Sequence, residues 1–229
     1  MAPYDTLRAI RQAGTTPQSR RRMPDAVHRG LGVFALAVMT PLLLMLAALV
    51  KADSPGPALY PAERMGVGGR PFRCFKFRTM TWQPHGDEPA ITMDGDRRIT
   101  RFGKVLRRFR IDELPQLINV ARGEMNLIGP RPEDPRFVDF DDPLHRTVFT
   151  SKPGITGLTQ LAFVDEASLL GSDGATADRL YREVILPRKV ALDARYLSRR
   201  SWRLDLWILA RTFQAVIGGT AVIDESHVG

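Results

Sequence analysis

Residues 107–132, RRFRIDELPQLINVARGEMNLIGPRP, are the stretch around which the rest of the chain is organised. A basic start leads to two adjacent carboxylates, Asp112 and Glu113. From Leu114 onward, apolar residues recur at the i, i+3, i+4 and i+7 positions of a helix, and Gly123 is a typical stop signal. Asp112 stands where an N-cap residue would stand. We therefore predict a short helix with the carboxylate pair at its N-terminus, followed by the rigid turn GPRP.

The carboxylate pair has a structural explanation and a chemical one, and the two are compatible. Asp112 would cap the helix, and Glu113 would interact favourably with the helix dipole. Guanidinium groups around a helix N-terminus, however, are typical of a phosphate site. We expect a carboxylate in such a site to have a lowered pKa and to stay ionised, so that it could attack phosphorus or hold a divalent cation. The flanking arginines are Arg107, Arg108, Arg110 and Arg131.

Length and charge limit the function classes. The 229 residues suit one domain with a sizeable core. The net charge of +8 indicates an anionic partner, such as nucleic acid, acidic lipid headgroups or a phosphorylated substrate. Cys74 is the single cysteine, which excludes a disulfide framework and a cysteine metal site. The four histidines lack ligand spacing, which argues against zinc.

The N-terminal part combines a basic arm with an apolar run. Residues 1–26 are polar and basic, and we predict a mobile arm. Residues 31–50, LGVFALAVMTPLLLMLAALV, carry no charge and are long enough to span a bilayer as one helix. Pro41 lies at the centre of the run and divides it into halves of about 15 Å, roughly half the hydrocarbon thickness.

Two paths through the membrane fit this run. Basic residues lie on both of its sides, which is typical of two cytoplasmic flanks. A re-entrant helix over residues 27–50, broken at Thr40 and Pro41, would return to the same face, and the Thr40 hydroxyl could bond a freed carbonyl. The alternative is a Pro-kinked helix that spans the bilayer. The residues alone leave both paths open.

The remaining chain, residues 51–217, is predicted to form the main domain, with a flexible tail at 218–229. Residues 63–69 predict a hairpin turn, and 72–80 (FRCFKFRTM) predict a strand that alternates aromatic and basic side chains. Such alternation suits single-stranded nucleic acid, or a sheet whose Lys76 and Arg78 meet phosphate.

Three further segments follow this strand. Residues 96–108 show amphipathic helical spacing, whereas 133–145 are acidic and proline-rich and indicate a surface segment. Residues 177–217 are helical and cationic, with an apolar stripe and two tryptophans that suit a membrane surface. A helix packed on the domain is the alternative for this last segment.

In its ordered motifs the chain resembles the bacterial sugar transferases, the monotopic phosphoglycosyl transferases that act on polyprenol phosphate. The resemblance runs from about His28 to Phe213, and seven motifs in the same order make it specific. They are the basic start with its Pro-broken apolar helix, SPGPALY, ERMGVGGRPF, KFRTM, DRRITRFGKVLRR, DELPQLINVARGEMNLIGPRP and KPGITGLTQL.

The resemblance implies a fold, a location and a reaction. It implies a mainly helical α+β domain on the cytoplasmic face of the bacterial inner membrane, carried by a re-entrant membrane helix, with amphipathic surface helices. It implies transfer of a phosphosugar from a UDP-sugar to polyprenyl (undecaprenyl) phosphate, with Mg²⁺ and release of UMP, as the first membrane step of glycoconjugate or exopolysaccharide synthesis. It implies inner-membrane lipids as partners and no nucleic acid. It is also compatible with a homodimer.

The resemblance also assigns site residues by motif. Asp112 matches a nucleophile that forms a covalent phosphosugar intermediate, and Glu113 matches its partner, acting through the metal or as a proton acceptor. Both are expected to hold the Mg²⁺. The expected phosphate-binding cations are Lys76, Arg107 and Arg131, with Arg78 and Arg98 as further candidates.

The sequence departs from the family pattern at two places. The family start usually has an aspartate three residues after Lys-Arg, whereas here His28 and Arg29 precede Gly32. After KPGITGLTQL many members have a Gly-Arg segment, whereas here AFVDEASLL follows, so the identity of the sugar cannot be carried over from the family.

The competing hypothesis is a membrane-tethered basic nucleic-acid-binding protein. Against it, no nucleic-acid module is recognisable, and the acidic pair would repel a phosphate backbone.

Overall fold

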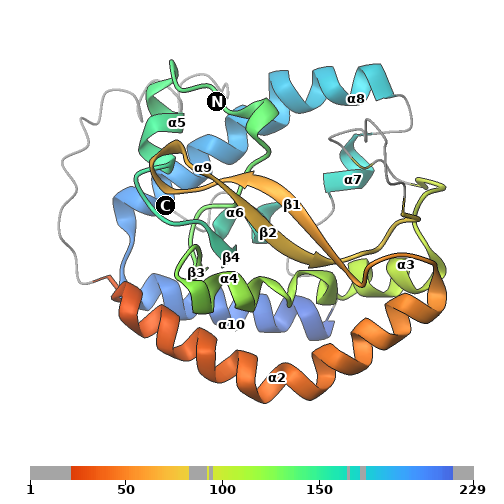
Figure 1. Cartoon of the computed structure of the whole chain (residues 1–229). Coiled ribbons are helices and arrows are strands. Elements are labelled where there is room, and N and C mark those ends of the chain that lie inside the picture. The colour runs from red at the N-terminus through yellow and green to blue at the C-terminus, as the bar shows by residue number, and fades with distance from the viewer. Residues whose placement is uncertain (1–21, 83–91, 93–94, 164–165, 171–173, 219–229) are drawn as a thin grey trace.

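The structure is a computed structural model that describes residues 22–82, 92, 95–163, 166–170 and 174–218. Within these residues the chain is mainly helical with two small sheets, which confirms the predicted α+β class (Figure 1). The predicted arm and tail lie outside the described residues, apart from the few positions next to the first and last helices.

The helices and strands follow one another along the chain with short connections. Figure 1 shows α2 and α10 along the base of the molecule, with the β1–β2 hairpin above them. In order, the elements are α2 (Asp25–Asp53), β1 (Leu59–Met65), β2 (Pro71–Phe77), α3 (Arg101–Arg108), α4 (Gln116–Arg122), β3 (Asn126–Ile128), α5 (Pro143–Val148), β4 (Gly154–Thr156), α6 (Leu158–Ala162), α7 (Glu166–Leu169), α8 (Gly174–Leu180), α9 (Leu186–Arg199) and α10 (Trp202–Gly218).

The apolar run forms one continuous helix, α2, which is longer than predicted and long and apolar enough to cross a membrane. The expected break at Thr40 and Pro41 is wrong: Pro41 lies inside the helix, which bends near its middle (Figure 1). The Thr40 Oγ1 donates a hydrogen bond to the Leu36 carbonyl at 2.7 Å. A proline together with such a hydroxyl bond to the preceding turn is a sufficient cause of a bend.

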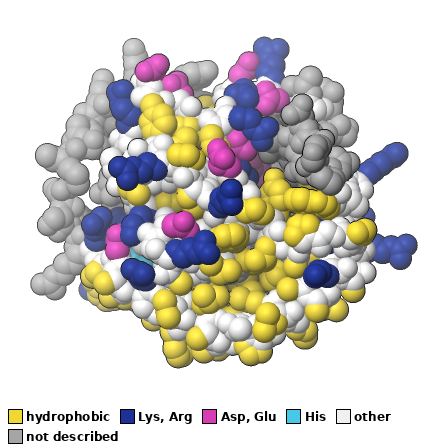
Figure 2. Space-filling model, viewed as in Figure 1, with side chains coloured by type: hydrophobic (Ala, Val, Ile, Leu, Met, Phe, Trp, Pro, Cys, Tyr) yellow, Lys and Arg dark blue, Asp and Glu magenta, His cyan; other side chains and the backbone are white. Residues whose placement is uncertain are grey.

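Both ends of α2 contact the same domain. Near the N-terminal end, His28 is fully buried and Arg29 Nε donates to the carbonyl of Ala121 on α4 at 2.9 Å. Near the C-terminal end, Leu46 and Val50 join a buried cluster with residues of β2 and α3. Between these ends most apolar side chains of α2 are exposed, and they form the lower surface in Figure 2.

Gly32 lets the first half of α2 approach α4 closely. A Cβ at this position would lie 2.4 Å from Val120 Cγ1, and Val120 is fully buried. A side chain as large as the aspartate of the family pattern would not fit without moving one helix. The N-terminal end is held instead by His28, whose Nε2 lies 3.1 Å from Arg200 Nη2, and by an ion pair of Asp25 with Lys152.

The predicted hairpin is confirmed. Strands β1 and β2 pair antiparallel, with Tyr60 opposite Lys76, and the turn between them contains the short 3₁₀ segment η1 (Val67–Gly69). A second sheet pairs β3 and β4 in parallel. Helix α3 confirms the amphipathic pattern of residues 96–108, and Thr100 caps it by accepting from the amide of Gly103.

The C-terminal helices form most of the core. Helix α8, the π-helical turn η4 (Tyr181–Ile185) and α9 follow without interruption, with Pro187 in the first turn of α9. Helix α10 packs on the domain, as the alternative for this segment expected, and it also exposes apolar side chains, so that its contact with a membrane stays a prediction. Its Ile208 is fully buried against the domain, whereas Trp202 and Phe213 are exposed.

Replacing Gly32 should show how closely α2 is held. We expect Gly32→Ala to lower the free energy of unfolding by about 1–3 kcal/mol, because the added methyl overlaps Val120. The control is Gly30→Ala on the same helix, where a Cβ meets nothing within 4 Å. It should stabilise by about 0.5–1 kcal/mol, as alanine does in a helix interior. Denaturation in lipid nanodiscs measures both, and equal effects would contradict the close packing.

Candidate active site

The carboxylate pair lies in a short 3₁₀ turn, η2 (Ile111–Glu113), between α3 and α4. Helix α4 begins only at Gln116, and no side-chain hydrogen bond caps it. The prediction that Asp112 is an N-cap residue is therefore wrong, and with it the picture of a phosphate site on that helix end. The predicted stop is confirmed, because Gly123 ends α4 with a φ of +81°.

Arg110 holds a strained backbone immediately before this turn. Its φ of +54° makes it the one non-glycine residue with positive φ in the described part of the chain. A left-handed conformation costs a residue with a side chain about 1–2 kcal/mol, and such strain clusters at functional sites. This left-handed conformation turns the backbone between α3 and η2, and Glu113 of η2 then meets Lys76 of β2.

Glu113 is the anionic partner of two cations. Lys76 Nζ, from β2, donates to its Oε1 at 2.9 Å, and Arg131 Nη2, from the turn after β3, lies 3.6 Å from the same oxygen. Burial raises the pKa of Glu113, but Lys76, Arg131 and Arg110 together outweigh that effect and lower it to about 2. Glu113 is therefore ionised at neutral pH.

Asp112 differs from its neighbour. Burial and, next, the negative charge of Glu113 raise the pKa of Asp112 to about 6, against the opposing effect of nearby cations. This corrects the expectation of a lowered pKa, because the cations contact Glu113 rather than Asp112. No hydrogen bond or ion pair to the Asp112 carboxylate is found in the described part of the chain. Two adjacent carboxylates with separated pKa values are the usual basis for two different roles.

The structure brings three of the predicted phosphate-binding cations to this pair. Lys76 and Arg131 contact Glu113, and Arg107 lies close enough to Asp112 for their charges to interact. Arg107 is oriented by its Nε, which donates to Thr79 Oγ1 at 2.8 Å. Together these side chains form what we call the cation cluster, Lys76, Arg107 and Arg131.

Arg98 and Arg78 have other partners. The guanidinium of Arg98 pairs with Asp96, with 2.6 Å between Nη2 and Oδ2, and it lies near Arg107 at the edge of the cluster. Arg78 is 4% exposed, and its guanidinium donates to the carbonyls of Val50, Ser54 and Pro55 at the end of α2. These three bonds assign Arg78 to fixing that end of α2.

Asn119, which the sequence analysis missed, connects the strand to the helix of the site. Its side-chain oxygen accepts from the amide of Phe75, and its nitrogen donates to the carbonyl of Arg73 and to Glu124. These bonds hold β2, and therefore Lys76, against α4. Asn119 lies off the predicted apolar stripe, so its burial and its several hydrogen-bond partners follow from the fold and not from the sequence pattern.

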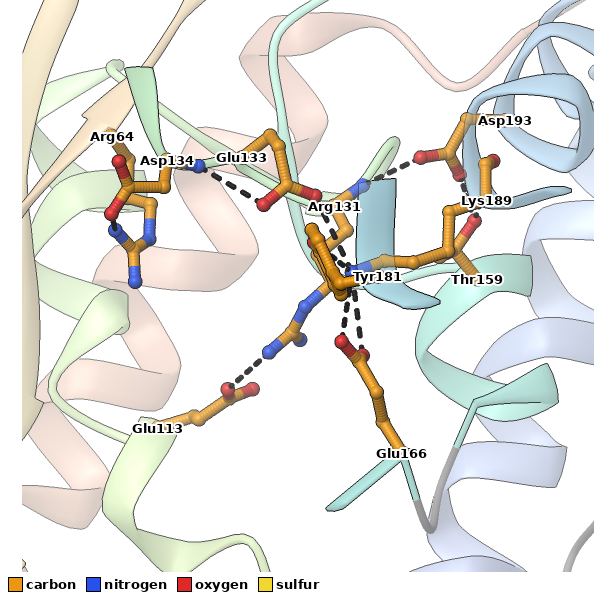
Figure 3. A network of polar contacts seen from close by, with 10 residues as sticks. All are labelled: Arg64, Glu113, Arg131, Glu133, Asp134, Thr159, Glu166, Tyr181, Lys189 and Asp193. Carbon is orange, nitrogen blue, oxygen red and sulfur yellow. Dashed lines mark hydrogen bonds and ion pairs between the residues drawn. The ribbon is translucent and has the colours of Figure 1, made fainter. Parts of the chain in front are cut away.

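A second polar network, also missed, lies behind Arg131 (Figure 3). Lys189 of α9 is 3% exposed and lies 3.3 Å from carboxylate oxygens of both Glu133 and Glu166. Its Nζ also donates to Tyr181 Oη at 2.8 Å. Glu133 was expected in a surface segment, which is wrong for its largely buried side chain, and the cationic helical pattern around Lys189 did not indicate that this side chain is buried.

Asp193, one turn beyond Lys189, fixes the backbone of Arg131. Its carboxylate accepts from the Arg131 amide at 3.1 Å and from the Thr159 hydroxyl at 2.5 Å. Burial raises the pKa of Asp193 to about 7, although both hydrogen bonds act in the opposite direction. The turn that carries Arg131 is thus fastened to α9 on the side away from the carboxylate pair.

The donor set suits a magnesium ion that is shared with a substrate. No group of three histidine, cysteine or acidic side chains is gathered for a metal in the described residues. Mg²⁺ commonly uses one or two protein carboxylates together with substrate phosphates and water. Asp112 and Glu113 supply that number, and among the described residues no cation lies at hydrogen-bond distance from Asp112.

Comparison with known proteins gives a consistent result. The family model described as bacterial sugar transferase matches residues 19–219. The chain is 37% identical over 224 residues to a UDP-glucose:undecaprenyl-phosphate glucose-1-phosphate transferase of Caulobacter vibrioides, a match that covers 95% of this chain and 78% of that protein. It is 34% identical over 199 residues to the exopolysaccharide production protein ExoY of Rhizobium meliloti, covering 80% of each chain.

Other relatives are longer than this chain. An Aeromonas hydrophila UDP-N-acetylgalactosamine-undecaprenyl-phosphate N-acetylgalactosaminephosphotransferase is 38% identical over 200 residues, a match that covers 84% of this chain but 44% of that protein. The residues that the family model matches, 19–219, include α2, the carboxylate pair and the cation cluster. The match over residues 19–219 and the identity to relatives of similar length show that the chain belongs to the bacterial sugar transferase family, whose named members here are phosphoglycosyl transferases.

Proposed function

We propose that this enzyme transfers a sugar 1-phosphate from a UDP-sugar to undecaprenyl phosphate at a membrane surface. The observation that carries the proposal is the Asp112–Glu113 pair between the cations Lys76, Arg107 and Arg131, in a chain of this family. An anionic diphosphate fits such a cluster, and the names of the relatives supply the class of donor and acceptor.

The reaction proceeds in two displacements at one phosphorus atom. An Asp112 carboxylate oxygen forms a bond to the phosphorus that carries the sugar, and the bond to UMP breaks, with the electron pair leaving on UMP. A phosphate oxygen of undecaprenyl phosphate then attacks the same phosphorus and releases Asp112. The product is undecaprenyl diphospho-sugar. Covalent catalysis of this kind lets a soluble donor and a lipid acceptor use the site in turn.

The cation cluster and Glu113 have separate tasks. Phosphoryl transfer depends mainly on positioning and on stabilising negative charge, which Lys76, Arg107 and Arg131 supply. Because its pKa is about 2, Glu113 is a weak proton acceptor at neutral pH. Of its two implied roles, acting through the metal is therefore favoured over accepting a proton, and Glu113 also orients Lys76 and Arg131. Asp112 and Glu113 would hold a Mg²⁺ ion, which when bound neutralises charge on the diphosphate.

We further propose that α2 enters the membrane and returns to the same face. A helix that spanned the bilayer would place its two ends on opposite sides, yet both His28 and Val50 pack against one domain. The exposed apolar side chains lie between these ends, on the bent part of the helix (Figures 1 and 2). Basic residues flank both ends, which favours the cytoplasmic face of the inner membrane.

The activity is tested with purified protein, Mg²⁺, undecaprenyl phosphate and a panel of UDP-sugars, with UMP as the measured product. We expect UMP release with at least one sugar and a loss of about a thousandfold or more in Asp112→Asn, because the amide is not a nucleophile. Asp141→Asn, an exposed aspartate outside the site, is the matched control and should keep full activity. Full turnover by Asp112→Asn would contradict the assignment of the nucleophile.

The pH dependence follows from the raised pKa of Asp112. Because the ionised form attacks, we expect the rate to rise with pH through about 6, while Glu113 stays ionised throughout. Lys76 lowers the pKa of Asp112, so Lys76→Met should slow the reaction and move the midpoint to higher pH. Lys104→Met, at an exposed position on α3, should leave the midpoint unchanged. An unshifted midpoint in Lys76→Met would contradict this electrostatic coupling.

The path of α2 is tested by labelling introduced cysteines in intact and opened membrane vesicles. Arg22→Cys and Ala52→Cys place thiols at exposed positions before and after the apolar run, whereas the native Cys74 is buried. We expect an impermeant maleimide to label both from the same side. Labelling from opposite sides would establish a spanning helix.

A further inference from the structure

Lys189 is a buried cation that does not touch the carboxylate pair. It lies on α9, and its Nζ contacts Glu133, Glu166 and Tyr181 (Figure 3). Burial raises the pKa of the Tyr181 hydroxyl, and Tyr181 also lies close enough to Glu133 and Glu166 for their negative charges to raise it further. A lysine this deeply buried is rare unless it is paired, because moving its charge out of water is costly. The arrangement therefore balances the two glutamates with one ammonium group.

Arg131 stands between these glutamates and the carboxylate pair. Its guanidinium points toward Glu113, as Figure 3 shows, yet its charge also interacts with those of Glu166 and Glu133. Its backbone is fixed, because the Arg131 amide donates to Asp193. Its side chain can therefore change orientation, toward Glu113 or toward Glu133 and Glu166, while its backbone stays in place.

We propose that Lys189 is a positioning residue for the transfer reaction. By neutralising Glu133 and Glu166, it keeps the guanidinium of Arg131 directed to Glu113 and to the phosphate of the donor. This inference rests on the proposed function, in which Arg131 binds that phosphate. It adds a residue outside the cation cluster, on the far side of Arg131.

The physical reason is that Glu133 and Glu166 compete with Glu113 for the guanidinium of Arg131. Without the ammonium group of Lys189, Glu133 and Glu166 would be two partly buried carboxylates that lack an ion pair with any of the described residues. Arg131 already lies within the electrostatic range of both. The cost of an uncompensated buried charge is large enough to draw a flexible guanidinium away from Glu113. Charge at position 189 therefore decides where Arg131 points.

Glu166 lies in the segment AFVDEASLL, at the start of the short helix α7. A carboxylate introduced beside a phosphate-binding arginine would weaken the site unless a cation balanced it. Lys189, which lies 3.3 Å from Glu166, is that cation.

The test compares Lys189→Met, Lys189→Arg and the double variant Lys189→Met/Glu166→Gln in lipid nanodiscs. The readouts are the affinity for UDP with Mg²⁺ by calorimetry, and kcat and KM for UMP release. We expect Lys189→Met to lose about 10–100-fold in UDP affinity and in kcat/KM, as is typical when a supporting residue is removed. Removing the Glu166 charge should then restore about tenfold, a coupling usual for residues in one network.

Lys189→Arg and a packing control separate charge from structure. Lys189→Arg keeps the positive charge and should stay within about threefold of wild type, even if it packs less well. Val190→Ala, the neighbouring buried residue on α9, should lower the melting temperature while leaving UDP affinity unchanged. If Lys189→Met fails to fold, Lys189→Arg and the double variant still report on charge.

Three results would overturn the proposal: wild-type affinity in Lys189→Met, no gain in the double variant, or a loss in Lys189→Arg as large as in Lys189→Met. Each would reduce Lys189 to a packing role. A wild-type chain that binds UDP but releases no UMP from any UDP-sugar would instead overturn the proposed function, and the UDP affinities would still decide the role of Lys189. A wild-type chain that neither binds UDP nor releases UMP would overturn both.

Discussion

The ion pairs of Glu113 with Lys76 and Arg131 are the interaction on which the rest of the structure depends. They join the hairpin, the η2 turn and the turn after β3 at one carboxylate. By taking these two cations, Glu113 leaves Asp112 beside it without a close partner in the described part of the chain. The pair thus separates into an ionised anchor and an adjacent carboxylate with a raised pKa. Asn119 fixes the strand β2, which carries Lys76, and Asp193 fixes the turn that carries Arg131.

The η2 turn also packs near the apolar helix α2. Ile111, the residue before Asp112, packs in a cluster with Leu43, Leu46 and Val50 of α2. The carboxylate pair therefore follows directly on a residue that touches the apolar helix, close to where a lipid acceptor would enter. Arg78 strengthens this connection, because it bonds the carbonyls at the end of α2. A reaction between a soluble donor and a lipid acceptor needs this proximity.

Local patterns predicted local features well. The hairpin and the helix stop at Gly123 followed from the residue pattern, whereas Lys76, Arg107 and Arg131 were expected at the site from the resemblance to the family. Features set by distant contacts did not. Nothing near Lys189 in the sequence indicates Glu133 or Glu166, because the fold alone brings these residues together. Likewise, the raised pKa of Asp112 depends on which of the two adjacent carboxylates receives the cations.

The central claim is that Asp112 carries the sugar phosphate between donor and acceptor. Its most direct test is peptide mass spectrometry of the enzyme quenched in acid after reaction with a UDP-sugar and Mg²⁺ in the absence of the lipid acceptor. The account predicts an added mass equal to one sugar phosphate on Asp112, and loss of that mass when undecaprenyl phosphate is supplied before quenching. An active enzyme that never carries this mass on Asp112, or carries it on another residue, would contradict the account.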